Sequence, residues 1–357
     1  MKILHVITSL RTGGAEKLMV DLLPRLRDLG NDVELLVFDG IRTPFYEQLE
    51  AEGINIYALR IGGSVYNPMN IFKLIPYLKK YDIVHTHNTA PQLFAAIAHK
   101  FSNNCRLITT EHSTNNRRRS IKFFSFIDKW MYRQYTHIIC ISNIAETSLR
   151  NYLKEGFYNI STINNGVDIS KYMNAYPDQE ILNQFKGKKT AIMVAGFRWE
   201  KDHKTLIKAY QHLPEEYHLL LAGTGVLQPE YEKFCQELNL KNRIHFLGMR
   251  SDIPQLLKSV DVVIMSSHFE GLSLSSIEGM ASGKPFIASD VNGLREVVEG
   301  AGVLFPHEDD KTLAEEIQKL SENTGYRKKV ISLCQQKAKQ FDIKLMISSY
   351  NKLYNNY

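Results

Sequence analysis

The chain has 357 residues, of which 44% are hydrophobic and 23% are charged, and its net charge is +6. This length suits two domains of roughly 150 residues each, and the composition excludes an intrinsically disordered chain. The four cysteines have neither metal-binding nor redox spacing, which indicates buried thiols in a reducing compartment. The absence of an apolar run of about 18 residues excludes a predicted membrane span.

Short apolar runs alternate with amphipathic segments along the first half of the chain. The first run, 3–7, is too short for a signal peptide and is expected to form a buried strand. Alternation of this kind predicts βαβ units and a parallel sheet. The predicted strands are 3–7, 33–38, 54–59, 83–85, 106–110 and 137–141, and segments such as 15–29 and 91–99 are predicted helices.

The same alternation restarts after a polar segment, 174–189, which we interpret as an interdomain linker. We therefore predict an α/β fold with two Rossmann-like, doubly wound parallel-sheet domains, residues 1–173 and 190–335, facing each other across a cleft. A final helical segment, 336–357, is expected to pack back on the first domain. Ligands should bind at the carboxyl ends of the strands. The second set of predicted strands is 190–195, 218–222, 243–246, 260–265, 285–288 and 302–304.

Two glycines, Gly13 and Gly14, separate the first predicted strand from the first predicted helix. The surrounding residues lack the complete G-x-G-x-x-G pattern of a dinucleotide site. Either a tight structural turn or a loop that accommodates a diphosphate or an acceptor is compatible with this pattern. Glu16, two residues further on, is a candidate acceptor contact.

Polar residues end several later strands of the first half. We expect the rings of His85 and His87 to point to opposite faces of their strand, with His85 buried and His87 toward the cleft. His112 ends the next strand and is either a contact to acceptor or sugar or a satisfied structural histidine. Asn165 lies in a turn near the predicted linker, where we expect a mainly structural role close to the cleft, and it is also a candidate acceptor contact.

Residues 116–133 combine six basic residues and one acidic residue with several aromatic side chains. Such a helix can lie on an anionic bilayer with its aromatic side chains among the headgroups. The alternative is an amphipathic helix whose aromatic residues belong to the core. No nucleic-acid-binding module is visible, so a nucleic-acid partner is not expected. The predicted membrane contacts are Arg117, Arg118, Arg119, Lys122, Phe123, Phe124 and Trp130.

Basic residues follow two strands of the second half. Arg198 and Lys201 are placed to stabilise the negative charge of a departing diphosphate, a large term in catalysis. The alternative for both is an exposed cation at the start of a helix. Arg250, after a later strand, either stacks on a nucleotide base or lies on the surface.

The segment 268–285 follows an apolar strand and opens a helix that Ser273 or Ser275 can cap. Gly271 allows close approach of a ligand to the backbone, and the free amides of the helix start favour a phosphate. Glu270 and Glu278 can flank one elongated ligand and bind its vicinal hydroxyls. The alternative is a pair of surface glutamates around a capped helix.

This segment resembles the Glu-x7-Glu motif of glycosyltransferase family 4, whose members are retaining enzymes with the GT-B fold. The Gly-x-Pro that follows, residues 293–298 and the turn after the first strand are similar to the family as well, so that the resemblance runs through the whole chain. It implies that the donor sugar contacts Glu270, that the ribose contacts Glu278, and that the donor is held by the amides of Gly271, Leu272 and Ser273.

The resemblance also assigns roles outside this segment. It implies that His87 supports the oxocarbenium-like transition state and that the loop with Gly13 and Gly14 lies under the donor phosphates. It places the reading of the base edge near Arg250. The family usually has an arginine five residues before Lys201, where this chain has Gly196, so Arg198 is the candidate replacement.

The implied function is retaining transfer of a sugar from a nucleotide sugar, with a UDP-sugar favoured, to a glycan or lipid-linked acceptor in bacterial surface polysaccharide synthesis. No Asp-x-Asp pair occurs in the chain, so we expect catalysis without a metal or other cofactor. The implied location is the cytoplasm, with peripheral binding to the inner leaflet of the cytoplasmic membrane. Alternatives are a nucleotide-sugar epimerase or hydrolase on the same fold and a non-catalytic sugar-nucleotide-binding protein.

Overall fold

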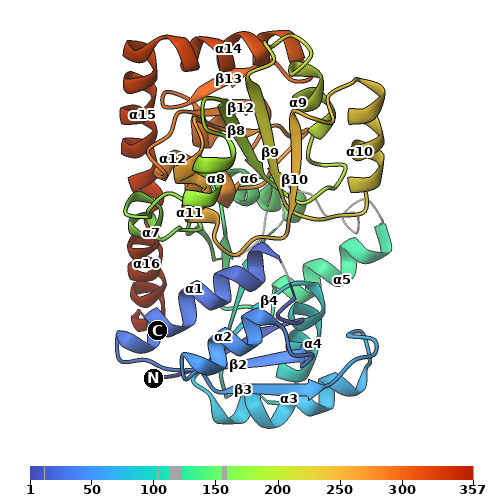
Figure 1. Ribbon diagram of the computed structural model, residues 1–357. Helices are drawn as coiled ribbons and strands as arrows, with labels where there is room; N and C mark the ends of the chain where they lie inside the picture. Colours follow the sequence, from blue (N-terminus) through green and yellow to red (C-terminus); the bar gives the residue numbers. More distant parts are fainter. Residues whose placement is uncertain (12, 103, 113–121, 155–158, 357) are drawn as a thin grey trace. The chain divides into compact units, whose positions relative to one another are not determined.

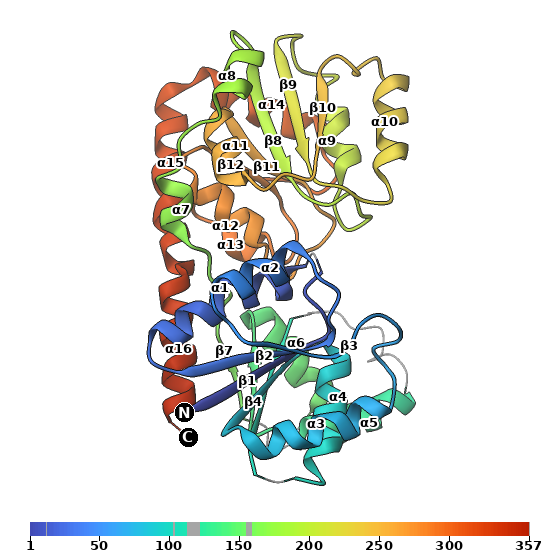
Figure 2. The same ribbon diagram turned by 60° about the horizontal axis from the view of Figure 1, so that its bottom comes forward.

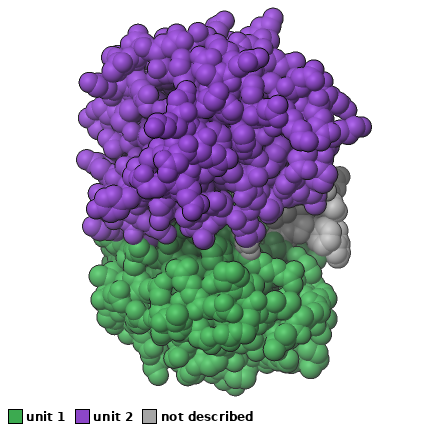
Figure 3. Space-filling view, in the orientation of Figure 1, with its two compact units in different colours: residues 1–165, 346–357 green, residues 166–345 purple. Residues whose placement is uncertain are grey.

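The computed structural model describes residues 1–11, 13–102, 104–112, 122–154 and 159–356 (Figure 1). The chain forms two compact units (Figure 3). Unit 1 comprises residues 1–165 and 346–357, and unit 2 comprises residues 166–345. No described helix is long and apolar enough to cross a membrane.

Unit 1 is built on a parallel seven-stranded sheet with the strand order β3-β2-β1-β4-β5-β6-β7. The chain reverses direction across the sheet between β1 and β4, and ligands of doubly wound folds bind at such a switch point. Its strands are β1 (Lys2–Ile7), β2 (Asp32–Asp39), β3 (Ile56–Arg60), β4 (Ile83–His87), β5 (Arg106–Glu111), β6 (His137–Cys140) and β7 (Ile160–Thr162).

Helices connect these strands, as parallel pairing requires. They are α1 (Gly14–Asp28), α2 (Pro44–Ala51), α3 (Met69–Lys80), α4 (Thr89–His99), α5 (Lys122–Tyr132) and α6 (Asn143–Leu153). The last helix of the chain, α16 (Ile343–Asn355), contributes its residues from 346 onward to this unit. Its end lies beside α1 in Figures 1 and 2, and the Asn31 side chain donates to Asn351 Oδ1 at 3.0 Å.

Unit 2 has a parallel six-stranded sheet with the order β10-β9-β8-β11-β12-β13, so its switch point lies between β8 and β11. The strands are β8 (Lys189–Val194), β9 (Tyr217–Ala222), β10 (Ile244–Gly248), β11 (Val262–Met265), β12 (Phe286–Ser289) and β13 (Val303–Phe305). The helices are α7 (Ile169–Met173), α8 (Gln179–Gln184), α9 (His203–Ala209), α10 (Gln228–Glu237), α11 (Ile253–Ser259), α12 (Leu274–Ala281), α13 (Arg295–Val298), α14 (Asp310–Glu322) and α15 (Thr324–Ala338), followed by the short helix η2 (Lys339–Phe341).

Each sheet lies in its own hydrophobic core. The strand β1 is buried from Ile3 to Ile7, and β11 is buried along its whole length. Strands buried on both faces read as continuous apolar runs, which explains why the sequence pattern locates them. The close packing extends to Gly279 of α12, where an added Cβ would lie 2.7 Å from the Phe286 ring.

The predicted fold of two Rossmann-like parallel-sheet domains is confirmed. The three-residue strand β7 was not predicted, because its sequence is too short to show a pattern. The unit boundary at residue 165 also differs from the predicted linker, 174–189. Residues 166–188 belong to unit 2 and include α7 and α8. Val167 N donates to Phe341 O and Ile343 N donates to Val167 O, both at 2.9 Å, which ties this segment to the end of the unit.

Candidate functional site

The loops after β8 and β11 meet at the switch point of unit 2. Lys201 Nζ and Glu270 Oε1 form an ion pair, and Ser267 Oγ donates to the same carboxylate oxygen at 3.0 Å. The side chains of Lys201 and Glu270 are 21% and 14% exposed, so solvent screens the pair weakly while a ligand can still reach it. Two residues that lie 69 positions apart in the chain are therefore brought together, as the predicted donor site requires.

Backbone hydrogen bonds hold these two loops in register beyond the ends of their strands. Asp202 N donates to Ser266 O at 3.1 Å, and His268 N donates to Glu200 O at 2.9 Å. The Asp202 side chain accepts from Thr205 N at 3.1 Å and so caps α9. These bonds fix the backbone on both sides of the Lys201–Glu270 pair.

Gly293 packs closely against the backbone of Glu270. It was not predicted as a site residue. Its φ of +86° lies in the left-handed region, and an added Cβ would lie 2.2 Å from Glu270 O. Glu270 N donates to Asn292 O at 3.2 Å, and Gly293 N donates to Glu296 Oε2 at 2.6 Å. The two Glu270 contacts, to Asn292 and Gly293, set its backbone position, and a left-handed glycine packed this closely has no substitute.

The helix α12 starts directly after Ser273, which occupies the N-cap position. The predicted side-chain cap is wrong for Ser273, whose hydroxyl makes no capping hydrogen bond among the described residues. The first amides of a helix have no intrahelical partners, so this end remains suited to an anion. Glu278 is buried in α12 with 6% exposure, which contradicts its alternative interpretation as a surface glutamate. Leu272 and Gly271 lie in the loop between Glu270 and this helix start.

The two arginines predicted for this site differ in their surroundings. Arg198 is exposed, and a Cβ built on Gly196 would lie 3.7 Å from Arg198 Nε. The guanidinium of Arg198 therefore lies close to Gly196, the position at which glycosyltransferase family 4 usually has its arginine. Arg250 instead binds Asp252 through two bonds, of 2.8 and 2.5 Å, and Asp178 at 3.3 Å. The bond to Asp252 raises the pKa of Arg250. These contacts favour the alternative in which Arg250 lies on the surface over stacking on a base.

The turn after β1 lies at the switch point of unit 1. Gly13 is the N-cap of α1, and a Cβ added there would lie 2.1 Å from Glu16 Oε2. Glu16 therefore folds back over the helix start, where Asn88 Nδ2 donates to it at 3.5 Å. Burial raises the pKa of Glu16. This position suits a capping residue at N3 better than an acceptor contact. Around Gly14 an added Cβ would meet open space, so a ligand can approach the backbone there.

The prediction that His85 and His87 point to opposite faces of β4 is wrong. The rings of His85 and His87 stack with centroids 4.5 Å apart, because residues two positions apart in a strand share a face. Both are fully buried, so His87 is not exposed at the strand end, and the prediction that it faces the cleft stays a prediction. His112, at the end of β5, is partly exposed, and its Nε2 lies 3.0 Å from His87 Nδ1.

These histidines belong to one hydrogen-bonded chain within unit 1. His87 Nε2 lies 3.0 Å from His5 Nδ1, and His5 Nε2 lies 3.4 Å from the Tyr354 hydroxyl. That hydroxyl lies 2.6 Å from His85 Nδ1, and His85 Nε2 lies 2.8 Å from Thr110 Oγ1. Burial lowers the pKa of His5 to about 3 and that of His112 to about 4, and it lowers the pKa values of His85 and His87 as well.

At neutral pH each of these imidazoles therefore carries a single ring proton. A neutral imidazole donates through one nitrogen and accepts through the other, so reversing one bond reverses its neighbours. The tautomer of His112 is thereby coupled to Tyr354 on the last helix of the chain. The sequence analysis did not identify His5 and Tyr354 as site residues, because neither belongs to a motif that contains His87.

Asn165 is 3% exposed, and its Oδ1 has no hydrogen-bond partner among the described residues. A buried carbonyl oxygen of this kind calls for a donor from water or a ligand. Its proposed place in acceptor binding therefore stays open as a prediction.

The predicted membrane segment is described in part. Arg117, Arg118 and Arg119 lie outside the described residues, as do the side chains of Lys122, Phe123 and Phe124. Trp130 packs against the core of unit 1, in line with the core alternative for this residue. Phe126 on the same helix is 77% exposed.

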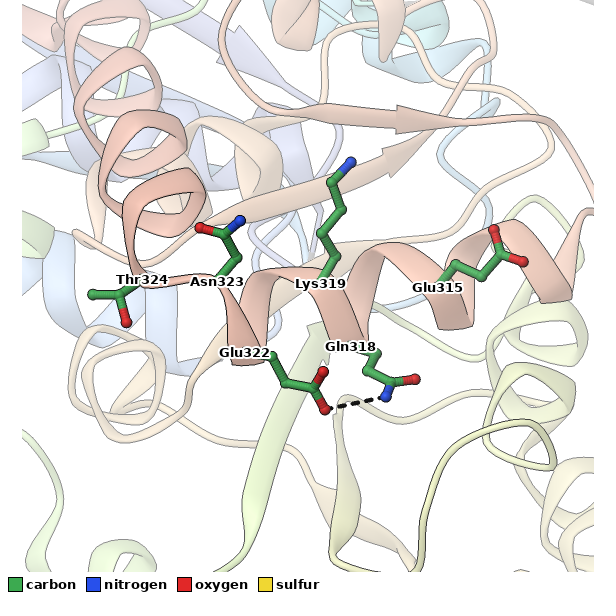
Figure 4. Close-up of a pocket in the computed structure, with 6 residues that line it drawn as sticks. All are labelled: Glu315, Gln318, Lys319, Glu322, Asn323 and Thr324. Atoms are coloured by element: carbon green, nitrogen blue, oxygen red, sulfur yellow. Dashed lines mark hydrogen bonds between the residues drawn. The ribbon is translucent and has the colours of Figure 1, made fainter.

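A separate hollow of unit 2 lies along the end of α14 and the start of α15 (Figure 4). Its rim is polar, and Gln318 Nε2 donates to Glu322 Oε1 at 3.1 Å across one helical turn. None of the predicted site residues lines it. We therefore place the candidate site at the strand ends and not in this hollow.

Two family models match the chain. The model of Glycosyltransferase Family 4 matches residues 12–171, and that of Glycosyl transferases group 1 matches residues 177–337. The two matched ranges correspond approximately to the two units.

Curated relatives are similar over varying lengths. The UDP-Gal:alpha-D-GlcNAc-diphosphoundecaprenol alpha-1,3-galactosyltransferase of Escherichia coli is 28% identical over 63% of this chain and 62% of its own length. An N,N'-diacetylbacillosaminyl-diphospho-undecaprenol alpha-1,3-N-acetylgalactosaminyltransferase of Campylobacter jejuni is 28% identical over 53% of this chain. The chain thus spans 62% and 52% of these two relatives. A 4-alpha-N-acetylgalactosaminyltransferase of Campylobacter jejuni, which acts on a diphospho-undecaprenol-linked sugar by its name, is 26% identical over 94% of each chain.

Solved structures share the fold. The HepE protein of Anabaena in complex with UDP has a TM-score of 0.88 at 23% identity and is covered over its whole length, as is this chain. The sucrose-phosphate synthase of Thermosynechococcus elongatus has a TM-score of 0.79 at 20% identity, with 100% of this chain and 99% of that chain covered. The architecture is GT-B.

Proposed function

The chain belongs to the glycosyltransferases of family 4 and group 1, and on this premise we propose that it transfers a sugar from a UDP-sugar to a lipid-linked or glycan acceptor in surface polysaccharide synthesis. The observation that carries the proposal is the Lys201–Glu270 pair beside the start of α12. A cation, a carboxylate and a helix amino terminus in one place suit a diphosphate joined to a sugar.

In this proposal the donor lies along the loop between β11 and α12. Glu270 accepts hydrogen bonds from the sugar hydroxyls, and Glu278 does so from the ribose. The amides of Gly271, Leu272 and Ser273 hold the diphosphate. The preference for uridine is supported by two likenesses, since the Escherichia coli relative takes UDP-Gal by its name and HepE was crystallised with UDP-glucose.

The proposed chemistry is a same-face substitution. The bond between the sugar C1 and the phosphate oxygen breaks as the acceptor oxygen bonds to C1 from the same side. The acceptor proton passes to the departing phosphate oxygen. Lys201, Arg198 and the start of α12 stabilise the negative charge that develops on the diphosphate, so no metal ion is required. The loop contacts described above hold the backbone beside Lys201 and Glu270.

We assign the acceptor contacts to unit 1, where His112 is the partly exposed end of the histidine chain. An acceptor carried on a lipid diphosphate is supported by the names of the curated relatives. Exposed Phe126 on α5 further supports contact with the membrane surface, with the chain bound peripherally on its cytoplasmic side. Failure of anionic liposomes to sediment the protein at low salt would remove this part of the proposal.

A direct test is transfer from UDP-hexoses to undecaprenyl diphosphate carrying one N-acetylhexosamine, followed by NMR of the product. We expect an acceptor-dependent product with the anomeric configuration of the donor, formed equally well in EDTA. An inverted linkage would contradict the same-face mechanism, and activity lost in EDTA and restored by Mn²⁺ would contradict the metal-free chemistry. Release of UDP at the same rate without acceptor would favour a hydrolase or epimerase on this fold.

A further inference from the structure

Three loops at the carboxyl ends of β8, β11 and β13 bring Asp202, His268 and His307 together in unit 2. One potential ligand atom of each residue lies within 4.8 Å of the other two. None of the three residues has a role in the proposed transfer reaction. Their grouping therefore requires a separate explanation.

The two imidazoles face each other. His268 Nδ1 lies 2.8 Å from His307 Nε2. The Trp199 ring stacks on His268, with centroids 5.2 Å apart and planes inclined by 29°. The backbone bond from His268 N to Glu200 O holds the residue from the other side. The stacking contact restricts the His268 ring, and the backbone bond holds the loop that carries it.

Asp202 provides an observation that the histidines alone would not. It is 3% exposed, and its carboxylate caps α9 through Oδ1. Its other oxygen, Oδ2, is buried and has no hydrogen-bond partner among the described residues. A buried carboxylate oxygen without a donor is costly, and a bound cation would satisfy it.

A second carboxylate stands next to the histidines. Glu308 Oε1 lies 3.5 Å from His268 Nδ1 and 3.9 Å from His307 Nε2. Its backbone has a φ of +63°, an uncommon conformation for a residue other than glycine. This side chain can supply a fourth ligand or a hydrogen bond to a bound ion.

We propose that Asp202, His268 and His307 bind one divalent transition-metal ion of the zinc class. Two imidazole nitrogens and one carboxylate oxygen are donors that Zn²⁺, Co²⁺ and Ni²⁺ accept, whereas Mg²⁺ and Ca²⁺ prefer oxygen. On binding, the ring proton shared by the two histidines moves to an outer nitrogen, so that both facing nitrogens present lone pairs. The ion replaces the hydrogen bond between them.

Such an ion would join the loops that carry the donor-site pair. Asp202 adjoins Lys201, and His268 lies two residues before Glu270. Cross-linking the loops from β8, β11 and β13 would restrict their motion without touching the reacting atoms. The site is independent of the proposed transfer reaction and is tested without it.

The test uses the full chain, freed of metal by EDTA and then dialysed. Titration with Co²⁺ should give a saturable visible absorption band at one ion per chain, and Zn²⁺ should displace it and raise Tm. In His307→Ala the apparent affinity should fall at least 10-fold, because one of three protein ligands is lost. His212→Ala is the matched control, since His212 is 38% exposed like His307 and lies 2.6 Å from the Asp310 carboxylate.

The proposal is overturned by the absence of saturable Co²⁺ or Zn²⁺ binding up to about 1 mM, far weaker than typical protein zinc sites. It is equally overturned if His307→Ala and His268→Gln both bind the ions as the unaltered chain does. Circular dichroism verifies that each variant is folded. A loss of binding in His212→Ala equal to that in His307→Ala would show general surface binding and would also reject the site.

Discussion

Buried neutral histidines are the most distinctive residues of unit 1. His5 and His85 face each other on paired strands, in register between β1 and β4, and His87 follows two residues later. Without charge at neutral pH, they can share protons along one chain and present a defined tautomer at His112. A defined tautomer is what a residue that contacts substrate needs, because donor and acceptor atoms must match the ligand.

Because it is buried, His5 should make the stability of the protein depend on pH. The folded pKa of His5 is about 3, below its ordinary value of 6.5, so between these values the unfolded chain binds more protons. The contribution of His5 to the free energy of unfolding is therefore fully present above pH 6.5 and is lost as the pH decreases toward 3. Its size is about 1.4 kcal/mol per unit of pKa difference between the folded and unfolded chain. Urea unfolding of the unaltered chain and of His5→Gln between pH 7 and 4.5 measures it. We expect a smaller pH dependence in the variant.

His212→Gln serves as the control for this measurement, because His212 lies on the surface. Its pH dependence should follow that of the unaltered chain. An identical slope for His5→Gln would contradict the assignment of His5 as a buried neutral group.

At the scale of elements, α16 completes the histidine chain. The Tyr354 hydroxyl lies between His85 and His5, although this residue is 269 positions from His85. Sequence patterns predict that the final helix packs on the first domain, but they do not pair particular side chains across such a separation. Strand ends at a switch point are different, since their meeting follows from topology. This is why Lys201 and Glu270 could be predicted together.

Replacement of Tyr354 by Phe tests this connection. Loss of the hydroxyl leaves buried imidazole nitrogens with one partner fewer, and we expect a stability loss of about 1–3 kcal/mol. We also expect a shift in the ¹⁵N resonances of His112, since its tautomer is coupled to the hydroxyl. Tyr135→Phe is the control, because Tyr135 is likewise buried but donates to Gln92 O, which is not part of the histidine hydrogen-bond chain.

A stability loss in both variants with a histidine shift in Tyr354→Phe alone is the expected result. If the His112 resonances are the same in all three proteins, the tautomers are not coupled through α16.

The turn between β12 and α13 contains Gly293, which packs against the Glu270 backbone. In Gly293→Ala the new Cβ would collide with Glu270 O, in addition to the strain of a left-handed φ. We expect the Glu270 loop to move and affinity for UDP to fall at least 10-fold. Gly300→Ala carries the strain alone, since its φ is +76° and the space around it is open. Calorimetry of UDP binding to the two variants separates them, and equal affinities would contradict the supporting role of Gly293.

At the scale of the whole molecule, two doubly wound sheets each end in a loop-lined switch point. The fold followed from the sequence because most strands contain a short apolar run and helical segments connect them. The candidate site followed in part. The sequence identified its motif residues. The burial of His87, the ion pairs of Arg250 and the position of Glu16 over the start of α1 arise from packing that a linear pattern does not contain.

The parallel sheet of unit 2 also explains why three loops far apart in the chain can form one cluster. Parallel strands present all their carboxyl ends at one edge, so residues 202, 268 and 307 meet although no motif links them. A similar convergence brings residues 201 and 270 together in the proposed donor site.

In the proposed donor site, unit 2 binds uridine diphosphate through Lys201 and Glu270, and calorimetry with UDP measures this binding. We expect saturable binding of UDP that is tighter than binding of GDP or ADP. Lys201→Ala should weaken it at least 10-fold, and Glu270→Ala should weaken binding of the UDP-sugar more than that of UDP. Lys204→Ala, which removes an exposed cation paired with Glu230, should bind UDP normally. UDP binding that is absent, or that is unaffected by Lys201→Ala, would contradict the proposed donor site.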